Sequence, residues 1–253
     1  MVNKFLLVTF LGMLSWGTLM ADEVNNPEPS PFKQENPDTI SNFSLSVDMK
    51  TRHTWRGGLT VAALNFQPTM EYTYKNLTVG AWSVYAVDAS YAEIDLYVSY
   101  KFLDYFSISV FDYFCPSDNK KMQFSRFFDY KNSTSPHLID VALSFDGTKR
   151  FPISLLASTW IYGADKDENG NMQYSTYFEA GYSTKVFKGD KFGFVIGGTP
   201  FKSYYSKEAN IVNLGFKYTK EMNFFKDIKT PVYGKMILNP YTENLYLVFG
   251  ITI

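Results

Sequence analysis

The chain has 253 residues and a formal net charge of −1; aromatic residues make up 18% of it and charged residues only 19%. This balance of charge argues against a basic nucleic-acid-binding protein, and the hydrophobic content of 45% excludes an intrinsically disordered chain. A single cysteine, Cys115, and two histidines exclude a disulfide framework and a multi-cysteine zinc site. The excess of aromatic residues therefore calls for a structural explanation.

The first 21 residues have the layout of a secretory signal peptide. Lys4 gives a short positive start, residues 5–14 are mostly apolar, and Ala21 stands just before an acidic pair. The apolar run is shorter than the roughly 20 residues that a transmembrane helix needs. Residues 22–40 are rich in Pro, Asn and Glu and lack periodicity, which indicates a flexible lead segment before a single domain over 41–253.

Beyond residue 40 the sequence alternates apolar and polar residues with a period of two, which is typical of β-strands. The pattern predicts twelve strands. Their ranges are 42–56, 62–74, 77–87, 91–102, 105–115, 136–146, 152–163, 172–186, 190–199, 208–220, 229–239 and 244–253. Residues 123–130 could form a further strand or belong to a long loop, and we favour the loop.

The predicted connections alternate between short turns and longer loops. The short ones are 75–76, 103–104, 147–151 and 187–189, and the longer ones are 57–61, 116–135, 164–171 and 200–207. Two connections break the pattern, a short one at 88–90 and a long one at 221–228. Short turns at one rim and long loops at the other are typical of an outer-membrane barrel. An even number of strands places both ends of the barrel at the short-turn, periplasmic rim.

Aromatic residues fall near the predicted strand ends, and aliphatic residues dominate between them. Near the short-turn rim the pattern places Phe43, Tyr72, Tyr74, Tyr100, Phe102, Tyr105, Phe106, Phe145, Phe151, Phe187, Phe192 and Tyr218. Near the other rim it places Trp55, Tyr85, Tyr91, Phe111, Tyr113, Trp160, Tyr162, Tyr174, Phe201 and Tyr241. Aromatic rings prefer the membrane–water interface, so we predict an all-β, antiparallel transmembrane barrel with up-and-down meander topology. The alternative is a secreted soluble all-β protein with these rings in its core.

Two stretches carry a resemblance to known proteins. Residues 43–114 run from FSLSVDMKTRHTWRGG to FSISVFDYF, and this part resembles exported bacterial proteins of the TorF type, regarded as porins. YFEAGYS (177–183) and LNPYTENLYLVFGITI (238–253) are similar to uncharacterised outer-membrane proteins of the Bacteroidetes type. The resemblance implies an outer-membrane barrel and a pore, and it supplies no catalytic residues. The sequence departs from many such barrels by ending in Ile253 rather than Phe, which weakens the signal that the insertion machinery reads.

Charged residues at the non-lipid positions of the strands are candidates to line the lumen. They are Asp48, Lys50, Arg52, Arg56, Glu71, Glu93, Asp95, Lys101, Asp140, Glu179, Lys185 and Lys217. They either pair into a network that fills the lumen or form a constriction that selects solutes, with Arg52, Arg56, Glu93 and Asp95 as its members. Twelve strands lie between the filled eight-stranded barrel and the open sixteen-stranded porin. The loop 116–135 is a candidate plug.

The expected function is passive diffusion of small solutes across the outer membrane of a Gram-negative bacterium, without a catalytic residue set or a cofactor. Expected partners are outer-membrane lipid, lipopolysaccharide, the barrel-insertion machinery and small solutes. One alternative is a lipid-modifying enzyme, which would use a histidine such as His137 with a serine and an acid; His53 is expected on the lipid-facing side. Another is a closed structural or adhesive barrel that acts through its outer loops.

An acidic loop also suggests a metal hypothesis. Asp165, Asp167, Asn169 and Gly170 match the first half of a calcium loop, but Thr176 stands where the motif needs Glu. The sequence favours an ordinary acidic hairpin loop.

Overall fold

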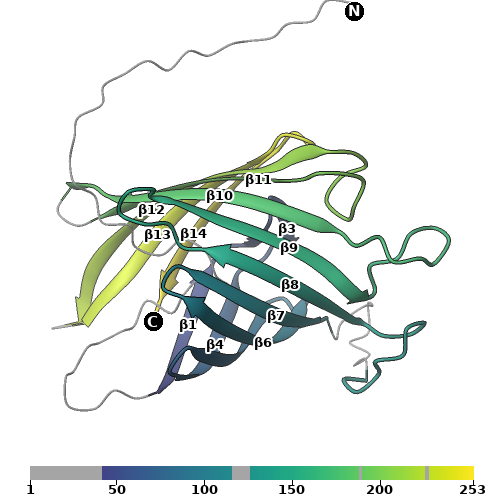
Figure 1. The fold of residues 1–253 in the computed structure, drawn as a ribbon. Helices are drawn as coiled ribbons and strands as arrows, with labels where there is room; N and C mark the ends of the chain where they lie inside the picture. Colours follow the sequence, from purple (N-terminus) through teal and green to yellow (C-terminus); the bar gives the residue numbers. More distant parts are fainter. Residues whose placement is uncertain (1–41, 116–125, 188–189, 226–227) are drawn as a thin grey trace, which may run out of the picture.

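The computed structural model describes residues 42–115, 126–187, 190–225 and 228–253, which form a closed antiparallel barrel of twelve consecutively paired strands (Figure 1). The predicted all-β architecture, an antiparallel meander barrel of twelve strands, is confirmed. The predicted signal peptide (1–21) and lead segment (22–40) lie outside the described residues. Within the described ranges, no helix is long and apolar enough to cross a membrane.

Twelve strands build the wall and two more form a separate hairpin. The wall strands are β1 (Phe43–Lys50), β4 (Asn65–Tyr74), β5 (Leu77–Ala86), β6 (Ala92–Leu103), β7 (Phe106–Phe114), β8 (His137–Phe145), β9 (Ile153–Gly163), β10 (Thr176–Lys185), β11 (Lys191–Thr199), β12 (Asn210–Phe225), β13 (Ile228–Asn239) and β14 (Asn244–Thr252). The hairpin consists of β2 (His53–Trp55) and β3 (Gly58–Val61), which pair only with each other.

The first predicted strand, 42–56, is wrong beyond its first half. The wall strand β1 ends at Lys50, and the chain then turns into the β2–β3 hairpin. Arg56 and Gly57 both have positive φ, 46° and 82°, and they form a two-residue turn between the paired residues Trp55 and Gly58. Positive φ at both central residues is the geometry of a type I′ hairpin turn, which glycine favours. The alternation of apolar and polar residues continues through this turn, so the period of two does not reveal where the wall strand ends.

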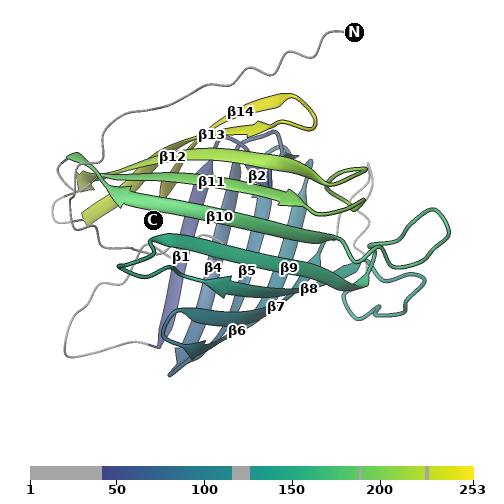
Figure 2. The same ribbon diagram turned by 45° about the horizontal axis from the view of Figure 1, so that its top comes forward.

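The two rims differ as the sequence predicted. The β4–β5, β6–β7, β8–β9 and β10–β11 turns are short and share one rim, while the other rim carries the longer connections (Figure 2). The long connection expected at 221–228 is wrong, since β12 extends to Phe225 and β13 begins at Ile228. The described part of 123–130, residues 126–130, contains turns and no strand.

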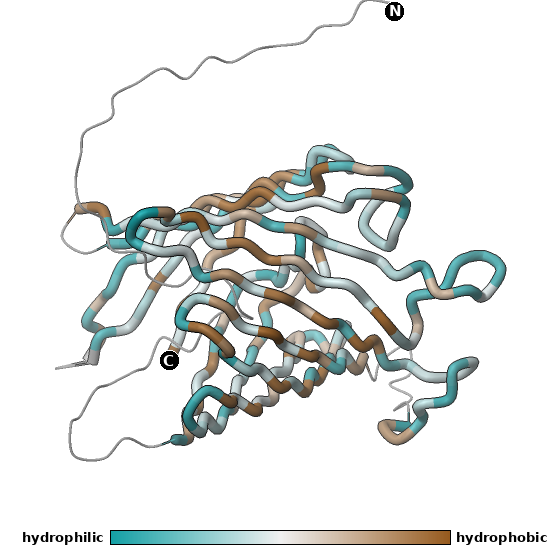
Figure 3. Tube along the Cα trace, viewed as in Figure 1, coloured by the Kyte–Doolittle hydropathy of each residue, from teal (hydrophilic) through white to brown (hydrophobic). Residues whose placement is uncertain are grey.

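The barrel has an apolar outside and a polar inside. Outward residues such as Leu45 (63% exposed) and Phe249 (60%) contrast with inward Lys50 (5%) and Asp48 (8%). Hydrophobic positions recur along the strands, and hydrophilic ones gather in the turns and loops (Figure 3). Almost all the aromatic residues predicted at the short-turn rim are exposed there, with Phe106 and Phe145 half-buried. At the other rim the prediction is partly wrong, because five of the rings point inward: Trp55, Tyr91, Phe111, Tyr113 and Trp160.

The seam that closes the barrel joins β1 to β14. The register pairs run only from Asp48 opposite Thr252 to Lys50 opposite Gly250. Val47 and Ile253 extend the seam by exchanging two backbone hydrogen bonds of 2.7 and 3.0 Å. On its other side β1 pairs with β4 over eight residues, from Phe43 to Lys50. The seam is therefore the shorter of the two attachments of β1.

Candidate functional site: a hairpin inside the outer mouth

The β2–β3 hairpin folds into the barrel and reaches the far wall. At its tip Gly57 packs directly against the backbone of β12: a Cβ atom there would lie 1.9 Å from the carbonyl oxygen of Val212. The Asn239 side-chain amide, on β13, donates a hydrogen bond of 3.2 Å to the Gly57 carbonyl. Only glycine combines this close approach with the positive φ of the turn. The hairpin tip is therefore seated on β12 and β13.

Arg56 is the polar anchor of the hairpin. Its Nη2 lies 2.9 Å from Oδ2 of Asp140 on β8, and the two side chains are 9% and 0% exposed. Its Nη1 donates to the hydroxyl of Tyr205. The guanidinium also lies 4.3 Å from the Trp55 ring centre and 4.9 Å from that of Tyr177. Removing one partner of such a buried pair leaves an uncompensated charge, which typically costs about 3–5 kcal/mol.

Trp55 is the apolar anchor. It stacks on Trp160 of β9, with ring centres 6.0 Å apart and an interplanar angle of 12°, and it meets Tyr113 of β7 edge-on at 5.7 Å. The loop between β11 and β12 closes over the same cluster, because Tyr204 packs on Trp160 at 4.9 Å and its backbone N–H donates to Ser175 Oγ at 2.8 Å. Two segments that lie far apart in the chain thus pack together inside the rim with the longer connections, which we call the outer mouth.

Along the rest of the inner wall, tyrosines lie across the neighbouring strands; Tyr177 is the one beside the hairpin, where it contacts Arg56. Three of them stand over a glycine of the neighbouring strand, where a Cβ atom would come within 2.0–2.3 Å of the ring or hydroxyl. Each hydroxyl donates a 2.6 Å hydrogen bond to a carboxylate. The sets are Tyr97 with Gly80 and Glu71, Tyr177 with Gly197 and Glu179, and Tyr233 with Gly250 and Asp48.

Lysines gather on one side of the lumen below the hairpin, which we call the lower lumen. Lys50 forms a 2.8 Å ion pair with Asp48, which also accepts from Tyr233 and Thr252. Lys217 and Lys235 face each other across β12 and β13, and their Nζ atoms lie 4.4 and 5.3 Å from the Tyr233 ring centre. The wall formed by β12, β13 and β1 is therefore basic, while Glu71 on β4 contributes a carboxylate to the facing wall.

The structure brings most of the predicted lumen residues together on the inside and separates a few. Arg56 belongs to the hairpin rather than to a wall strand, and Arg52 lies in the link between β1 and β2. Lys101 lies at the short-turn rim, where its half-exposed side chain is 3.5 Å from Asp146. Glu93 lies near the outer mouth and accepts hydrogen bonds from the Tyr91 hydroxyl (2.8 Å) and the Cys115 thiol (3.5 Å).

We call the β2–β3 hairpin, together with the wall and loop residues that pack around it, the plug. The sequence did not predict four of its residues: Tyr204, Tyr205, Trp160 as an inward residue, and Asn239. Only the position of Trp160 carried a usable signal, because it occupies the inward parity of β9 together with Ser154 and Ser158. The contacts of Tyr205 and Asn239 join residues more than 140 positions apart in the chain, and no local pattern encodes them.

The predicted plug, loop 116–135, packs elsewhere over its described part. His137 Nδ1 lies 2.6 Å from Asp112 Oδ1, and its Nε2 lies 2.7 Å from the Phe127 carbonyl oxygen. Tyr130 stacks on the His137 ring at 4.1 Å and donates to Asp112. His137 thus contacts the loop through Nε2 and its ring face, while its Nδ1 is engaged with Asp112 on β7. The other histidine, His53, lies inside the barrel against Trp82, so its expected lipid-facing position is wrong.

The carboxylates of the acidic loop accept hydrogen bonds from neighbouring residues of the same connection. Asp165 accepts from the backbone N–H and hydroxyl of Ser175, both at 2.7 Å. Asp167 accepts from the backbone N–H groups of Asn171 and Asn169, and the bond from Asn171 is the main cause of its lowered pKa. Within the described part of the chain, no three His, Cys, Asp or Glu side chains form a group suited to a metal ion.

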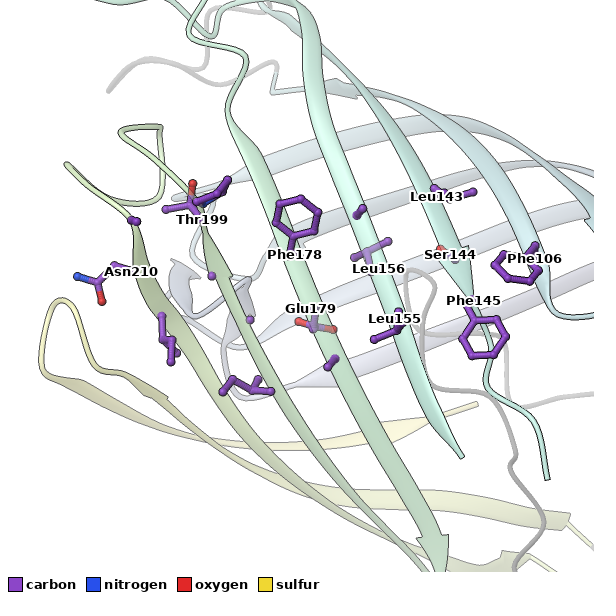
Figure 4. Close-up of a pocket in the computed structure, with 18 residues that line it drawn as sticks. Phe106, Leu143, Ser144, Phe145, Leu155, Leu156, Phe178, Glu179, Thr199 and Asn210 are labelled. Atoms are coloured by element: carbon purple, nitrogen blue, oxygen red, sulfur yellow. The ribbon is translucent and has the colours of Figure 1, made fainter. Parts of the chain in front are cut away.

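One apolar hollow, of about 930 Å³, lies on the wall around β8–β12 (Figure 4). Its large side chains include Leu143, Leu155 and Phe178, which share the outward face, and small residues at Ala157 and Ala180 deepen it. Its lining also includes Ser144, Leu156 and Glu179 from the inner face of the same strands.

Comparisons with known proteins add no family. Neither a scan against protein-family models nor a search of curated proteins finds a match to this chain. The assignment of function therefore depends on the geometry described above.

Proposed function

We propose that this chain is an outer-membrane barrel that conducts small solutes and that the β2–β3 hairpin limits their passage. The observation that carries the proposal is the reversal of the two faces: apolar side chains surround the barrel, and charged ones line it. In a soluble barrel the apolar face would be inside. In lipid this arrangement is required, because exposed charges on the wall are costly and every backbone group of a closed barrel is paired.

The same features support a proposed location. The proposed site is the outer membrane of a Gram-negative bacterium, reached through a cleaved signal peptide at 1–21. There phospholipid and lipopolysaccharide would surround the wall, and the insertion machinery would fold it. The aromatic rings exposed at the short-turn rim fit the membrane–water interface. The resemblance to TorF-type proteins, which is part of the same proposal, implies the same location.

The hairpin supports a restricted channel. It occupies the outer mouth through contacts with β7, β8, β9, β12 and β13. It is attached to the wall through only two links, residues 51–52 and 62–64. Passage therefore depends on how firmly Trp55 and Arg56 hold it.

Conductance across planar bilayers tests the proposal. We expect small, discrete openings from the purified wild-type protein and larger openings from Arg56→Ala, because the hairpin loses its buried ion pair. Arg150→Ala is the matched control: this arginine is exposed in the β8–β9 turn, away from the plug, and the variant should conduct like the wild type.

The outcomes separate the two parts of the proposal. If correctly folded wild-type and Arg56→Ala proteins both fail to conduct, the channel is refuted and a closed barrel that acts through its loops takes its place. If both conduct equally, the pore stands and the hairpin is not its restriction.

A further inference from the structure

The plug surrounds a group of aromatic residues in an unusual position. The chain has four tryptophans, and the three that follow the predicted signal peptide, Trp55, Trp82 and Trp160, all lie inside the outer mouth. In membrane proteins tryptophan is usually enriched at the lipid interface. Their location inside the barrel points to a role in the lumen.

These rings belong to one continuous strip across the inner wall. His53 of the hairpin packs on Trp82 of β5 at 5.4 Å. Trp82 stands directly opposite Asp95 of β6, and Asp95 stands opposite Tyr113 of β7. The Tyr113 hydroxyl donates to Asp140 at 3.1 Å, and Asp140 stands opposite Trp160. Five neighbouring strands therefore present this strip beneath the hairpin.

The strip contains buried polar atoms that the described chain does not satisfy. Asp95 Oδ1, Asp140 Oδ1, Trp160 Nε1 and His53 Nδ1 are all buried and lack a hydrogen-bond partner. Buried polar groups in native proteins are almost always paired with protein, water or a ligand. Four such atoms in one strip indicate that something outside the chain completes their hydrogen bonds.

The charge of the strip indicates which class of ligand could bind there. Glu93 and Asp95 occupy successive inward positions of β6, about 7 Å apart by the rise of a strand. The hydrogen-bond donors to Glu93 are a hydroxyl and a thiol, both neutral, whereas Asp140 has its own cation in Arg56. The aromatic side chains of Trp82 and Tyr113 flank Asp95 on both neighbouring strands. Carboxylates between aromatic faces are the environment that binds organic ammonium groups.

We propose that Asp95, assisted by Glu93 and flanked by Trp82 and Tyr113, binds a small organic cation of the alkylammonium class at the outer mouth. This deepens the proposed function by naming a solute class for the same lumen, and it rests on that function only for how the solute arrives. The ammonium group would lie against Asp95 Oδ1, with its alkyl part on the aromatic faces.

Intrinsic tryptophan fluorescence tests the site directly, because all three tryptophans that follow the predicted signal peptide lie at or beside it. The purified full barrel in detergent is titrated with methylammonium chloride, and sodium chloride of equal ionic strength serves as the reference. We expect a saturable change with methylammonium and none with sodium. Asp95→Asn should weaken binding at least tenfold, and Glu93→Gln should weaken it less. Glu208→Gln, exposed in the loop at the same rim, should bind like the wild type.

Several results would overturn the site. They are identical curves for sodium and methylammonium, the absence of a saturable response, and unchanged binding in the two β6 variants. Saturation by glucose instead of methylammonium would assign the strip to a neutral polyol and refute the cation. If Asp95→Asn does not fold, Glu93→Gln decides. Binding is measured without any current, so its failure is distinguishable from a failure of conduction.

Discussion

Polar groups of the barrel interior are satisfied by different kinds of residues at the outer mouth and in the lower lumen. Below the hairpin, Tyr97 and Tyr233 each lie over a glycine of the neighbouring strand and donate to a carboxylate of the wall. Above, the hairpin introduces residues that do not belong to the wall, and these hold Asp140, Trp160 and Tyr113. The wall fixes the shape of the lumen, whereas the inserted hairpin decides whether its outer end is filled.

The strongest test of this difference between the two regions displaces the tip of the hairpin from β12. Gly57→Val places a branched side chain where a Cβ atom alone would lie 1.9 Å from the Val212 carbonyl oxygen. We expect the hairpin to leave its seat, so that single-channel conductance rises severalfold and the hairpin becomes cleavable by protease.

A matched glycine separates the clash from backbone strain. Gly170 has nearly the same φ, +80° against +82°, but a Cβ atom at this position would have no atom within 4 Å. Gly170→Val should therefore keep wild-type conductance and protease resistance. Equal behaviour of the two variants would show that strain in the turn, rather than contact with β12, controls the mouth.

The second test compares the two kinds of ion pair. Arg56→Ala should lower the free energy of unfolding by about 3–5 kcal/mol, because it leaves Asp140 charged and buried. Lys101→Ala removes the 3.5 Å contact with Asp146, which is partly exposed at the short-turn rim, and should cost about 1 kcal/mol or less. Urea unfolding in detergent micelles measures both. Equal losses would mean that the plug is not the more tightly anchored region.

The smallest expected effect concerns Cys115, beside the outer mouth. Burial, assisted by the charge of Glu93, raises its pKa to about 12. An ordinary thiol ionises increasingly as the pH rises through about 8.5, whereas the Cys115 thiol should stay protonated well above that pH. Iodoacetamide should then react slowly with the folded protein at a mildly alkaline pH and rapidly after unfolding in urea. Rapid labelling of the folded barrel would show that the mouth is open to solvent there.

The sequence predicted the wall well, because the wall depends on a local property. Alternation assigned Asp48, Lys50, Glu71, Glu179 and Lys217 to the inside from their parity alone. The same rule failed at residues 51–61, where the chain leaves the wall without losing its period. A Trp-Arg-Gly-Gly run is compatible with a rim turn and with an inserted hairpin.

The contacts that distinguish the inserted hairpin from a rim turn are long-range. Arg56 meets Asp140 across 84 positions and Tyr205 across 149. Pairing over such distances is set by the closed geometry of the barrel, and a single sequence carries no trace of it. The aromatic belts were partly misassigned for the same reason: Trp55 and Trp160 lie at the height of the outer rim but on its inner side.

The seam between β1 and β14 also sets an order of events. Its hydrogen bonds join Val47 to Ile253, and its register places Asp48 opposite Thr252, a residue from the far end of the chain. Each of the remaining wall pairs joins strands that follow one another in the chain, and the β1–β4 pair encloses only the inserted hairpin. The ring cannot close until β14 has been made. Until β14 pairs with β1, one edge of each of these strands lacks a partner, and such open edges are sites where other chains can pair.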